Sequence, residues 1–387
     1  MELSIKSGKL NITESSIDPA FNSIESLIGF ASRQNEKRGF LFVSKVLGKH
    51  IPVKPSVMRS TYDLIAEKVQ VIDGSTLFIG MAETATGLGG GVADSYARMH
   101  PETRVAYQHT TRHFLNAKET LRISEAHSHA VSHILYEPLP DVAPVYQAAE
   151  HLVVVDDEIS TGNTLLNLVQ ESLTKIRPFS KVTVVALVSW LDSEKHERFL
   201  KLMSDYCIEH GVEMPEFDFV SLFEGKFEFY PNEDFKVSLP RDVDKQICMK
   251  PCLNDAGRQG CHMPMQLTGV EKDSIQKIIN QANGQKISII GTGEHLFVPF
   301  LIAEAIERQG NNVVFQSTTR SPVIVDGTTI VNAREIPISR DSGIYRHYIY
   351  NHSENLKNFV MIEHQSLADD YKQVGVAVWS IFWPMLT

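Results

Sequence analysis

The residues best suited to chemistry lie in one segment, VVVDDEISTGNT, at positions 153–164. A run of valines leads into a triplet of acids, Asp156, Asp157 and Glu158. After Ile159 come five small or polar residues: Ser160, Thr161, Gly162, Asn163 and Thr164. The pattern predicts a strand, a tight turn and a helix start, where amide and hydroxyl groups can bind a phosphate. Adjacent carboxylates repel phosphate, so they suit hydroxyls or a cation. A ribose 5-phosphate fits both features; an ordinary helix cap is the simpler alternative.

The segment resembles the signature of the type I phosphoribosyltransferases, the class of orotate phosphoribosyltransferase, which bind phosphoribosyl pyrophosphate (PRPP). It departs from that signature by a third acid, Glu158, and by Asn163 where a second glycine is frequent. The resemblance implies that Asp156 and Asp157 hold the ribose hydroxyls near Mg²⁺, and that residues 160–164 cradle the 5-phosphate. The candidate catalytic residues are therefore the three acids, with Glu158 or a loop histidine as a candidate for moving a proton.

The resemblance also implies a loop that binds pyrophosphate after an earlier strand. Here the strand expected over 75–82 runs into small residues, and the candidates are Ala82, Glu83 and Thr84. A carboxylate is unexpected beside pyrophosphate unless Mg²⁺ bridges the two groups or Glu83 points away. A glycine-containing turn between a strand and a helix is the alternative interpretation.

Basic side chains are concentrated in residues 108–133, where the related enzymes have a mobile loop that closes over the reacting centre. Such groups would offset the charge of the departing pyrophosphate. The candidates are Arg112, Lys118, Arg122, His127 and His129. The two histidines share a face of an extended chain and could also bind a metal or face solvent.

The segment 39–55 precedes these loops, and the resemblance implies that it contributes to the hood that selects the acceptor in related enzymes. Two interpretations of its basic residues stay open, a role in that hood or a solvent-exposed edge of the fold. These residues are Lys45, Lys49, His50 and Lys54.

The elements that must position these residues alternate between apolar runs and amphipathic runs. Strands are expected over 39–48, 75–82, 104–110, 129–138, 151–157 and 181–190, and helices over 56–70, 87–99, 164–176 and 193–210. No periodicity is evident over 111–127. Continuous apolar strands separated by helices predict a parallel α/β sheet covered on both faces. The resemblance implies that this sheet belongs to the Rossmann-like fold of the phosphoribosyltransferases. A charged stretch over 224–247 places the division between two domains near residue 240, giving domains 1–240 and 241–387.

The second half repeats the alternation, with helices over 271–282 and 297–309 and strands over 286–292, 312–318 and 358–364. VAYQHTTRH (105–113) aligns with VVFQSTTRS (313–321), and the strand of 77–89 aligns with that of 288–300, which brings Glu294 to the place of Glu83. The segment 358–366 aligns with 152–160, but no TGNT follows it. We interpret the second half as an α/β domain that resembles a degenerate copy of the first, without its own 5-phosphate loop.

The stretch Thr319-Arg320-Ser321-Pro322 resembles the motif of the TRSP domain. That domain follows a phosphoribosyltransferase domain in bacterial proteins of tellurite-resistance-type gene clusters, which implies a role in making a nucleoside-like metabolite. The candidate residues in this half are Thr319, Arg320, Ser321 and Arg258.

A cysteine cluster lies between the halves, at Cys248, Cys252, Cys261 and His262. Its spacing matches no standard zinc pattern, and a metal site and a plain connecting loop both stay open. Asp255, Arg258 and Gly260 in the same stretch suit an anionic ligand.

Composition narrows the class of protein. The 387 residues carry a net charge of −10, which disfavours a nucleic-acid polymer as partner. No apolar run has the length of a membrane span, and we expect a cytoplasmic protein; a homodimer is left open. The leading hypothesis is a Mg²⁺-dependent phosphoribosyltransferase that uses PRPP, or runs the reverse reaction, with an unspecified acceptor. The alternatives are a non-catalytic regulator that senses PRPP or a nucleotide and, with less support, a PRPP-type synthase.

Overall fold

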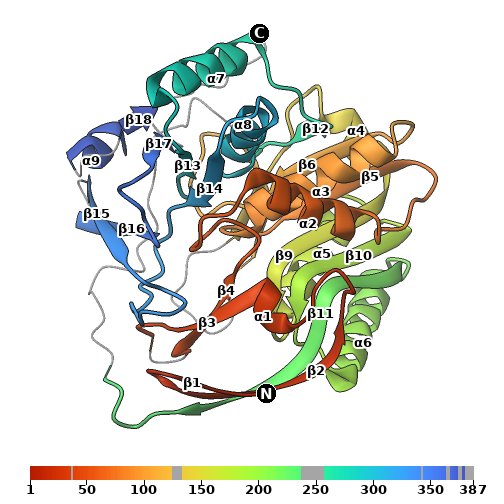
Figure 1. Cartoon of the computed structure of the whole chain (residues 1–387). Helices are drawn as coiled ribbons and strands as arrows, with labels where there is room; N and C mark the ends of the chain where they lie inside the picture. The colour runs from red at the N-terminus through yellow and green to blue at the C-terminus, as the bar shows by residue number, and fades with distance from the viewer. Residues whose placement is uncertain are drawn as a thin grey trace.

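The structure is a computed structural model that describes residues 1–35, 38–123, 133–236, 257–340, 343–362, 367–373 and 377–379. The chain forms two α/β halves side by side, the first built on a large sheet and the second on a smaller one (Figure 1). Within the described ranges no helix is both long and apolar enough to cross a membrane.

The large sheet has a core of five parallel strands: β5 (Ser75–Gly80), β6 (Val105–His109), β9 (Ala149–Ile159), β10 (Lys181–Ser189) and β11 (Glu216–Pro231). Its order is β1-β2-β11-β10-β9-β5-β6-β12. The outer strands β1 (Glu2–Ile5), β2 (Gly8–Ile17) and β12 (Cys261–Met263) run antiparallel to their neighbours. The central strands are buried along their length because helices cover both faces, as the continuous apolar runs predict.

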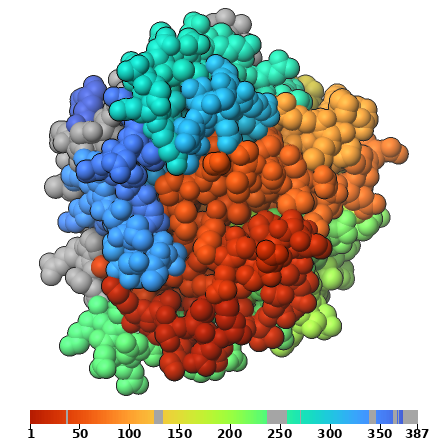
Figure 2. Space-filling view, viewed as in Figure 1, coloured from red at the N-terminus to blue at the C-terminus, as the bar shows by residue number. Residues whose placement is uncertain are grey.

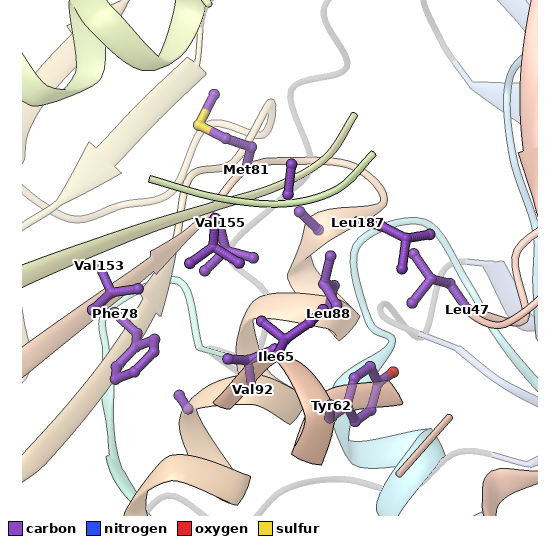
Figure 3. Close-up of a cluster of buried hydrophobic side chains, with 14 of the residues drawn as sticks. Leu47, Tyr62, Ile65, Phe78, Met81, Leu88, Val92, Val153, Val155 and Leu187 are labelled. Atoms are coloured by element: carbon purple, nitrogen blue, oxygen red, sulfur yellow. The ribbon is translucent and has the colours of Figure 1, made fainter. Parts of the chain in front are cut away.

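Two layers of helices cover this sheet. One layer holds α2 (Pro55–Ala66) and α3 (Ala85–Met99), and the other holds α5 (Asn163–Lys175) and α6 (Ser193–His210). Figure 3 shows the core between the first layer and the strands, where Ile65, Leu88 and Val92 meet Val153 and Val155. Short elements complete the half: α1 (Ile24–Leu27), α4 (Ala143–Ala148), the hairpin of β3 (Ile28–Ser32) and β4 (Phe40–Ser44), and the hairpin of β7 (Glu119–Ile123) and β8 (His133–Tyr136).

The second half is built on a parallel sheet of β13 (Ile287–Gly291), β14 (Val313–Ser317), β17 (Lys357–Met361) and β18 (Ala377–Trp379), with helices α7 (Gly269–Ala282), α8 (Phe297–Arg308) and α9 (Ala368–Gln373). A hairpin of β15 (Ala333–Arg340) and β16 (Gly343–Tyr350) stands where β7 and β8 stand in the first half. The order β14-β13-β17-β18 matches β6-β5-β9-β10 strand for strand. The prediction of a degenerate second copy is thereby confirmed at the level of topology.

The two halves pack closely through equivalent helices, α3 and α8. A Cβ atom on Gly90 of α3 would lie 2.6 Å from the Phe297 ring of α8, so the close approach requires glycine. Arg59 of α2 crosses the same interface and contacts Asp94 and Glu304 at 3.0 and 2.7 Å. Figure 2 shows the N-terminal segment, in red and orange, directly against the blue second half.

Several predicted boundaries differ from the structure. The strand expected over 39–48 ends at Ser44, and the irregular stretch 111–127 contains β7. The charged stretch expected to mark a boundary is still strand as far as Pro231, because β11 pairs with β2 beyond a bulge at residues 224 and 225. Residues beyond 240 also contribute β12 to the first sheet. A domain division near 240 stays a prediction, since residues 237–256 lie outside the described ranges.

Candidate active site at the switch point of the first sheet

The first sheet changes winding direction between β5 and β9. The chain steps from β5 to β6 toward one edge and from β9 to β10 toward the other. Since crossovers between parallel strands are right-handed, α3 and α5 lie on opposite faces and the loops after β5 and β9 diverge. Such a switch point, at the carboxyl ends of the strands, is where open α/β sheets bind ligands. The predicted phosphoribosyl segment and the predicted pyrophosphate loop are these two loops.

The acid triplet ends β9. Asp156 lies opposite Ala186 of β10, and the backbone N–H of Asp157 donates to Asp156 Oδ1 at 2.9 Å. Burial raises the pKa of Asp156 well above its usual range, and the adjacent charge of Asp157 adds to the rise. Burial also raises the pKa of Asp157, against the opposing charge of Lys49. The pair therefore holds a proton tightly by itself, and a hydroxyl donor or a cation would favour its ionised form.

Glu158 is occupied by an ion pair. Arg38 Nη2 donates to both of its carboxylate oxygens, at 2.6 and 2.8 Å. The guanidinium of Arg38 lies 4.8 Å from the centre of the Phe40 ring at the start of β4. This third acid thus connects the end of β9 to the β3–β4 hairpin, whose strand β4 lies at the start of the predicted hood segment 39–55. Arg38 is a site residue that was not predicted, although a basic pair, Lys37 and Arg38, directly precedes a strand in the sequence.

The turn after the triplet leads directly into the N-terminus of α5. Trp190 N–H donates to Ile159 O at 2.8 Å and fixes the end of β9, and Leu166 N–H donates to Gly162 O at the start of α5. Gly162 has φ of 75°, a left-handed conformation that glycine adopts without strain. The first N–H groups of α5 have no intrahelical partner by geometry and carry the positive end of the helix dipole. Thr161 and Asn163 are exposed beside them.

The loop after β5 is anchored at its base. Met81 N–H donates to Val155 O at 2.9 Å, which places the loop beside the last residue before Asp156. Ala82 N–H donates to Thr110 Oγ1 at 3.0 Å, and the peptide bond between Ala82 and Glu83 is cis. Figure 3 places Met81 at the end of the core, by Val155. Ala82 is buried, while Glu83 and Thr84 are partly exposed. The loop with the candidates Ala82, Glu83 and Thr84 therefore begins beside the strand end that carries Asp156.

The Glu83 side chain is directed at cations. Lys49 Nζ lies 3.3 Å from Glu83 Oε1, and Arg320 Nε of the second half lies 3.9 Å from Glu83 Oε2. Burial by itself would raise the pKa of Glu83, but Lys49, Arg320 and Arg112 outweigh it and the pKa lies below its usual range. Glu83 is thus an anion held among positive charges. Of the predicted hood lysines, Lys49 is the one at the site, and its side chain is only 4% exposed.

Of the other basic candidates that the structure describes, one lies near Glu83 and two lie on the surface. Arg112 follows β6, and its charge acts on Glu83. Lys118 pairs with Glu137 at 2.5 Å and Arg122 pairs with Glu119 at 2.5 Å, so both lie in surface ion pairs of the β7–β8 hairpin and not at the acids. His127 and His129 lie outside the described residues.

Arg258 is buried in an ion pair and does not face an open anion site. Its Nη2 lies 2.9 Å from Glu294 Oε2, and its Nε also donates to that oxygen at 3.0 Å. Glu294 aligns with Glu83 in the sequence, but no role was predicted for Glu294, because its partner Arg258 is not adjacent to it in the chain.

The cysteine cluster is only partly described, since Cys248, Cys252 and Asp255 lie outside the described ranges. Cys261 Sγ contacts Tyr107 O at 3.6 Å, while the exposed His262 contacts Asp141 O at 3.1 Å. Among the described residues no group of three or more metal-binding side chains forms.

Comparison with known families gives two matches in order along the chain. Residues 27–226 match the family described as phosphoribosyl transferase, and residues 255–377 match the TRSP domain that lies C-terminal to it. A comparison with curated proteins gives no match.

Solved structures that resemble this chain include an adenine phosphoribosyl transferase of Trypanosoma brucei in complex with AMP, pyrophosphate and ribose-5-phosphate. It matches at 14% identity and a TM-score of 0.32, and the match covers 55% of this chain and 86% of that one. An orotate phosphoribosyltransferase of Aeropyrum pernix matches at 15% identity and a TM-score of 0.29, covering 48% and 80%. An enzyme of Giardia lamblia complexed with 9-deazaadenine matches at 14% identity and a TM-score of 0.34, covering 52% and 94%.

Proposed function

The chain belongs to the phosphoribosyl transferase family, and we propose that it is a Mg²⁺-dependent enzyme that transfers the phosphoribosyl group of PRPP to an acceptor. The observation that carries the proposal is the position of the Asp156–Asp157 pair, which lies at the end of β9 beside the start of the loop after β5 and is followed by a small-residue turn into α5. This arrangement suits a ligand with two hydroxyls between two phosphate groups.

In this proposal the acidic residues bind the ribose hydroxyls, and other groups bind the phosphates. Asp156 and Asp157 accept hydrogen bonds from the ribose hydroxyls, and residues 160–164 bind the 5-phosphate through backbone N–H groups and hydroxyls. The loop at Ala82, Glu83 and Thr84 takes the pyrophosphate, with Arg112 nearby. The carboxylate pair and the pyrophosphate oxygens are the hard ligands that Mg²⁺ prefers, so the donor set fits this ion. Mg²⁺ supplies charge neutralisation at the leaving group.

The reaction breaks the bond from C1 of the ribose to the pyrophosphate oxygen, whose electron pair leaves with pyrophosphate. The acceptor nucleophile forms the new bond to C1. The chain's residues position the groups and stabilise charge, which is the main source of rate in such transfers. The reverse reaction, attack of pyrophosphate on a nucleotide, uses the same contacts. The β3–β4 hairpin, fixed to Glu158 by Arg38, is the proposed hood over the acceptor, and the proposed location is the cytoplasm.

The test is pyrophosphate release. The full chain with PRPP and Mg²⁺ is assayed against a panel of nucleobases and against a small-molecule cell extract, and products are identified by mass spectrometry. We expect release that depends on both Mg²⁺ and an acceptor. Tight PRPP binding without release for any acceptor would refute the enzyme and favour a sensor of PRPP, a role that the carboxylate of Glu83 in the pyrophosphate loop would suit.

A substitution at Gly162 tests the phosphate cradle. We expect Gly162→Ala to weaken ribose 5-phosphate binding about tenfold and to destabilise the chain by about 1–2 kcal/mol, because a side chain at positive φ is strained. Its Cβ would also lie 3.3 Å from the Phe199 ring. Calorimetric titration and thermal unfolding measure the two effects.

The matched control is Gly211→Ala. Gly211, at the end of α6, also has a positive φ, 64°, but a Cβ there meets nothing within 4 Å. This variant should lose stability through backbone strain but keep its affinity for ribose 5-phosphate. Equal ribose 5-phosphate affinity in Gly162→Ala and the unchanged chain would contradict the cradle.

A further inference from the structure

The second half repeats the hydrogen bonds of the first as well as its topology. Gln108 Nε2 donates to Tyr136 O, and Gln316 Nε2 donates to Tyr350 O. Likewise Ala82 N–H donates to Thr110 Oγ1, and Gly293 N–H donates to Thr318 Oγ1 in the second half. The loop after β13 and the Thr-Thr-Arg segment after β14 are therefore the structural counterparts of the loop after β5 and of the segment after β6.

Each half directs the glutamate of its loop at the other half. Glu294, in the loop after β13, accepts from Thr111 Oγ1 at 2.5 Å and from the Arg112 N–H at 2.8 Å. Glu83, in the loop after β5, faces Arg320, the counterpart of Arg112. The exchange is reciprocal, as it would be in a symmetric dimer.

The centre around Glu294 is closed. Its side chain is 2% exposed, and Arg258, which is 1% exposed, covers the carboxylate. At the position that follows the register pair Gly291 and Met361, where the first half has Asp156, the second half has Ile362. The second half therefore lacks the first acid of the ribose pair, and its loop is filled by its own ion pair.

The centre around Glu83 is open by comparison. Glu83 Oε1 makes no hydrogen bond within the described part of the chain, nor does Lys49 Nζ, whose side chain is 96% buried. Two cations, Lys49 and Arg320, face this one carboxylate, and Arg112 and His347 act on it from further away. Lys49 Nζ is ion-paired with Glu83 but donates no hydrogen bond among the described residues, and Arg320 adds a second cation, so this place suits an anion.

The TRSP stretch holds Arg320 in position. Ser321 N–H donates to Thr319 Oγ1, and the Tyr350 hydroxyl donates to Ser321 O at 2.8 Å. Pro322 O accepts from the Gln34 N–H at 3.0 Å, which connects the stretch to the β3–β4 hairpin of the first half. Arg320 is therefore carried on a backbone that is fixed to both halves.

We propose that Arg320 of the second half binds the pyrophosphate group at the site of the first half, so that the second half completes the active site as an internal partner. The inference rests on the proposed function, because it assigns the pyrophosphate to the loop after β5. It gives the motif Thr319-Arg320-Ser321-Pro322 a direct role and explains why a half without a ribose site stays joined to one that has it.

The test separates the two phosphate positions. The full chain and its Arg320→Ala variant are titrated calorimetrically with Mg²⁺-pyrophosphate and, separately, with ribose 5-phosphate. We expect the variant to lose about 10- to 100-fold in pyrophosphate affinity, the usual cost of a charge-assisted hydrogen bond. Ribose 5-phosphate affinity should stay within about twofold, and Arg320→Lys should recover part of the loss because it restores the charge. Arg346→Ala, an exposed arginine of the same half, is the matched control.

Each other outcome is decisive. Unchanged pyrophosphate affinity in Arg320→Ala overturns the inference, and so does equal loss for both ligands, which would indicate a structural role. If the unchanged chain binds ribose 5-phosphate but not pyrophosphate, the inference fails while the phosphoribosyl site survives. If it binds neither ligand, the proposed function itself fails.

Discussion

Replacing Asp156 and Asp157 together by asparagine is expected to lower kcat/KM for PRPP by about 10³-fold or more, while the chain stays folded. The two carboxylates are the proposed partners of the ribose hydroxyls and of Mg²⁺, and loss of a group that stabilises charge in a transition state costs about 10²–10³. Steady-state kinetics of pyrophosphate release measure the effect. Asp141→Asn, at an exposed aspartate, is the control and should be neutral.

The same variant should be more stable than the unchanged chain near neutral pH. Since burial raises the pKa of both carboxyls in the folded state, the folded chain binds protons more tightly than the unfolded chain. Stability is therefore lost as pH rises from the ordinary aspartate pKa through the raised values. Asparagine removes this loss, and we expect the free energy of unfolding to rise by about 0.5–2 kcal/mol, measured by thermal unfolding.

The affinity of the unchanged chain for PRPP should rise with pH over the same range. A variant that keeps its activity would contradict the assignment of the ribose site.

The largest effect on stability is expected at the buried pair of Arg258 and Glu294. Either Arg258→Ala or Glu294→Ala should destabilise the chain by about 3–5 kcal/mol, because each leaves a buried charge without its partner. Glu294 has a pKa well below its usual range, since His113 and Arg258 outweigh the effect of burial. Denaturant unfolding of the full chain measures the free energy of unfolding.

Two control variants test whether the loss of stability comes from a buried charge that is left without its partner. Arg346→Ala breaks the exposed pair with Glu335 and should cost less than about 1 kcal/mol. Arg258→Met combined with Glu294→Met removes both buried charges and should recover much of the loss. Equal, small costs for the buried and the exposed pair would contradict the expected stabilising role of the buried pair of Arg258 and Glu294.

The elements that were predictable from sequence are those whose signal is local. The apolar runs of β5, β9 and β10 are buried on both faces and could be recognised without knowledge of their partners. The segment 153–164 combines a strand end, acids and a glycine turn in consecutive residues, so its geometry is also local. The repeat between the halves was visible because buried strands and the Thr-Thr-Arg segments kept their spacing.

The features that were not predicted depend on partners distant in the chain. Strands β7, β15 and β16 were not predicted because they have mixed polarity, and the pairing of all three hairpins, β3–β4, β7–β8 and β15–β16, is decided by tertiary contacts. Lys118 and Arg122 looked like residues of a catalytic loop, but they have acidic partners close by on the same hairpin. Lys49 could not be told from other basic residues of its segment, because its partner Glu83 meets it only in the folded chain.

The most direct test of the account is calorimetric titration of the full chain with PRPP in the presence of Mg²⁺. We expect one binding site per chain, located in the first half, with affinity that is lost in the Asp156→Asn, Asp157→Asn variant and kept in Asp141→Asn. Absence of binding, binding that survives the double substitution, or two equivalent sites per chain would contradict it.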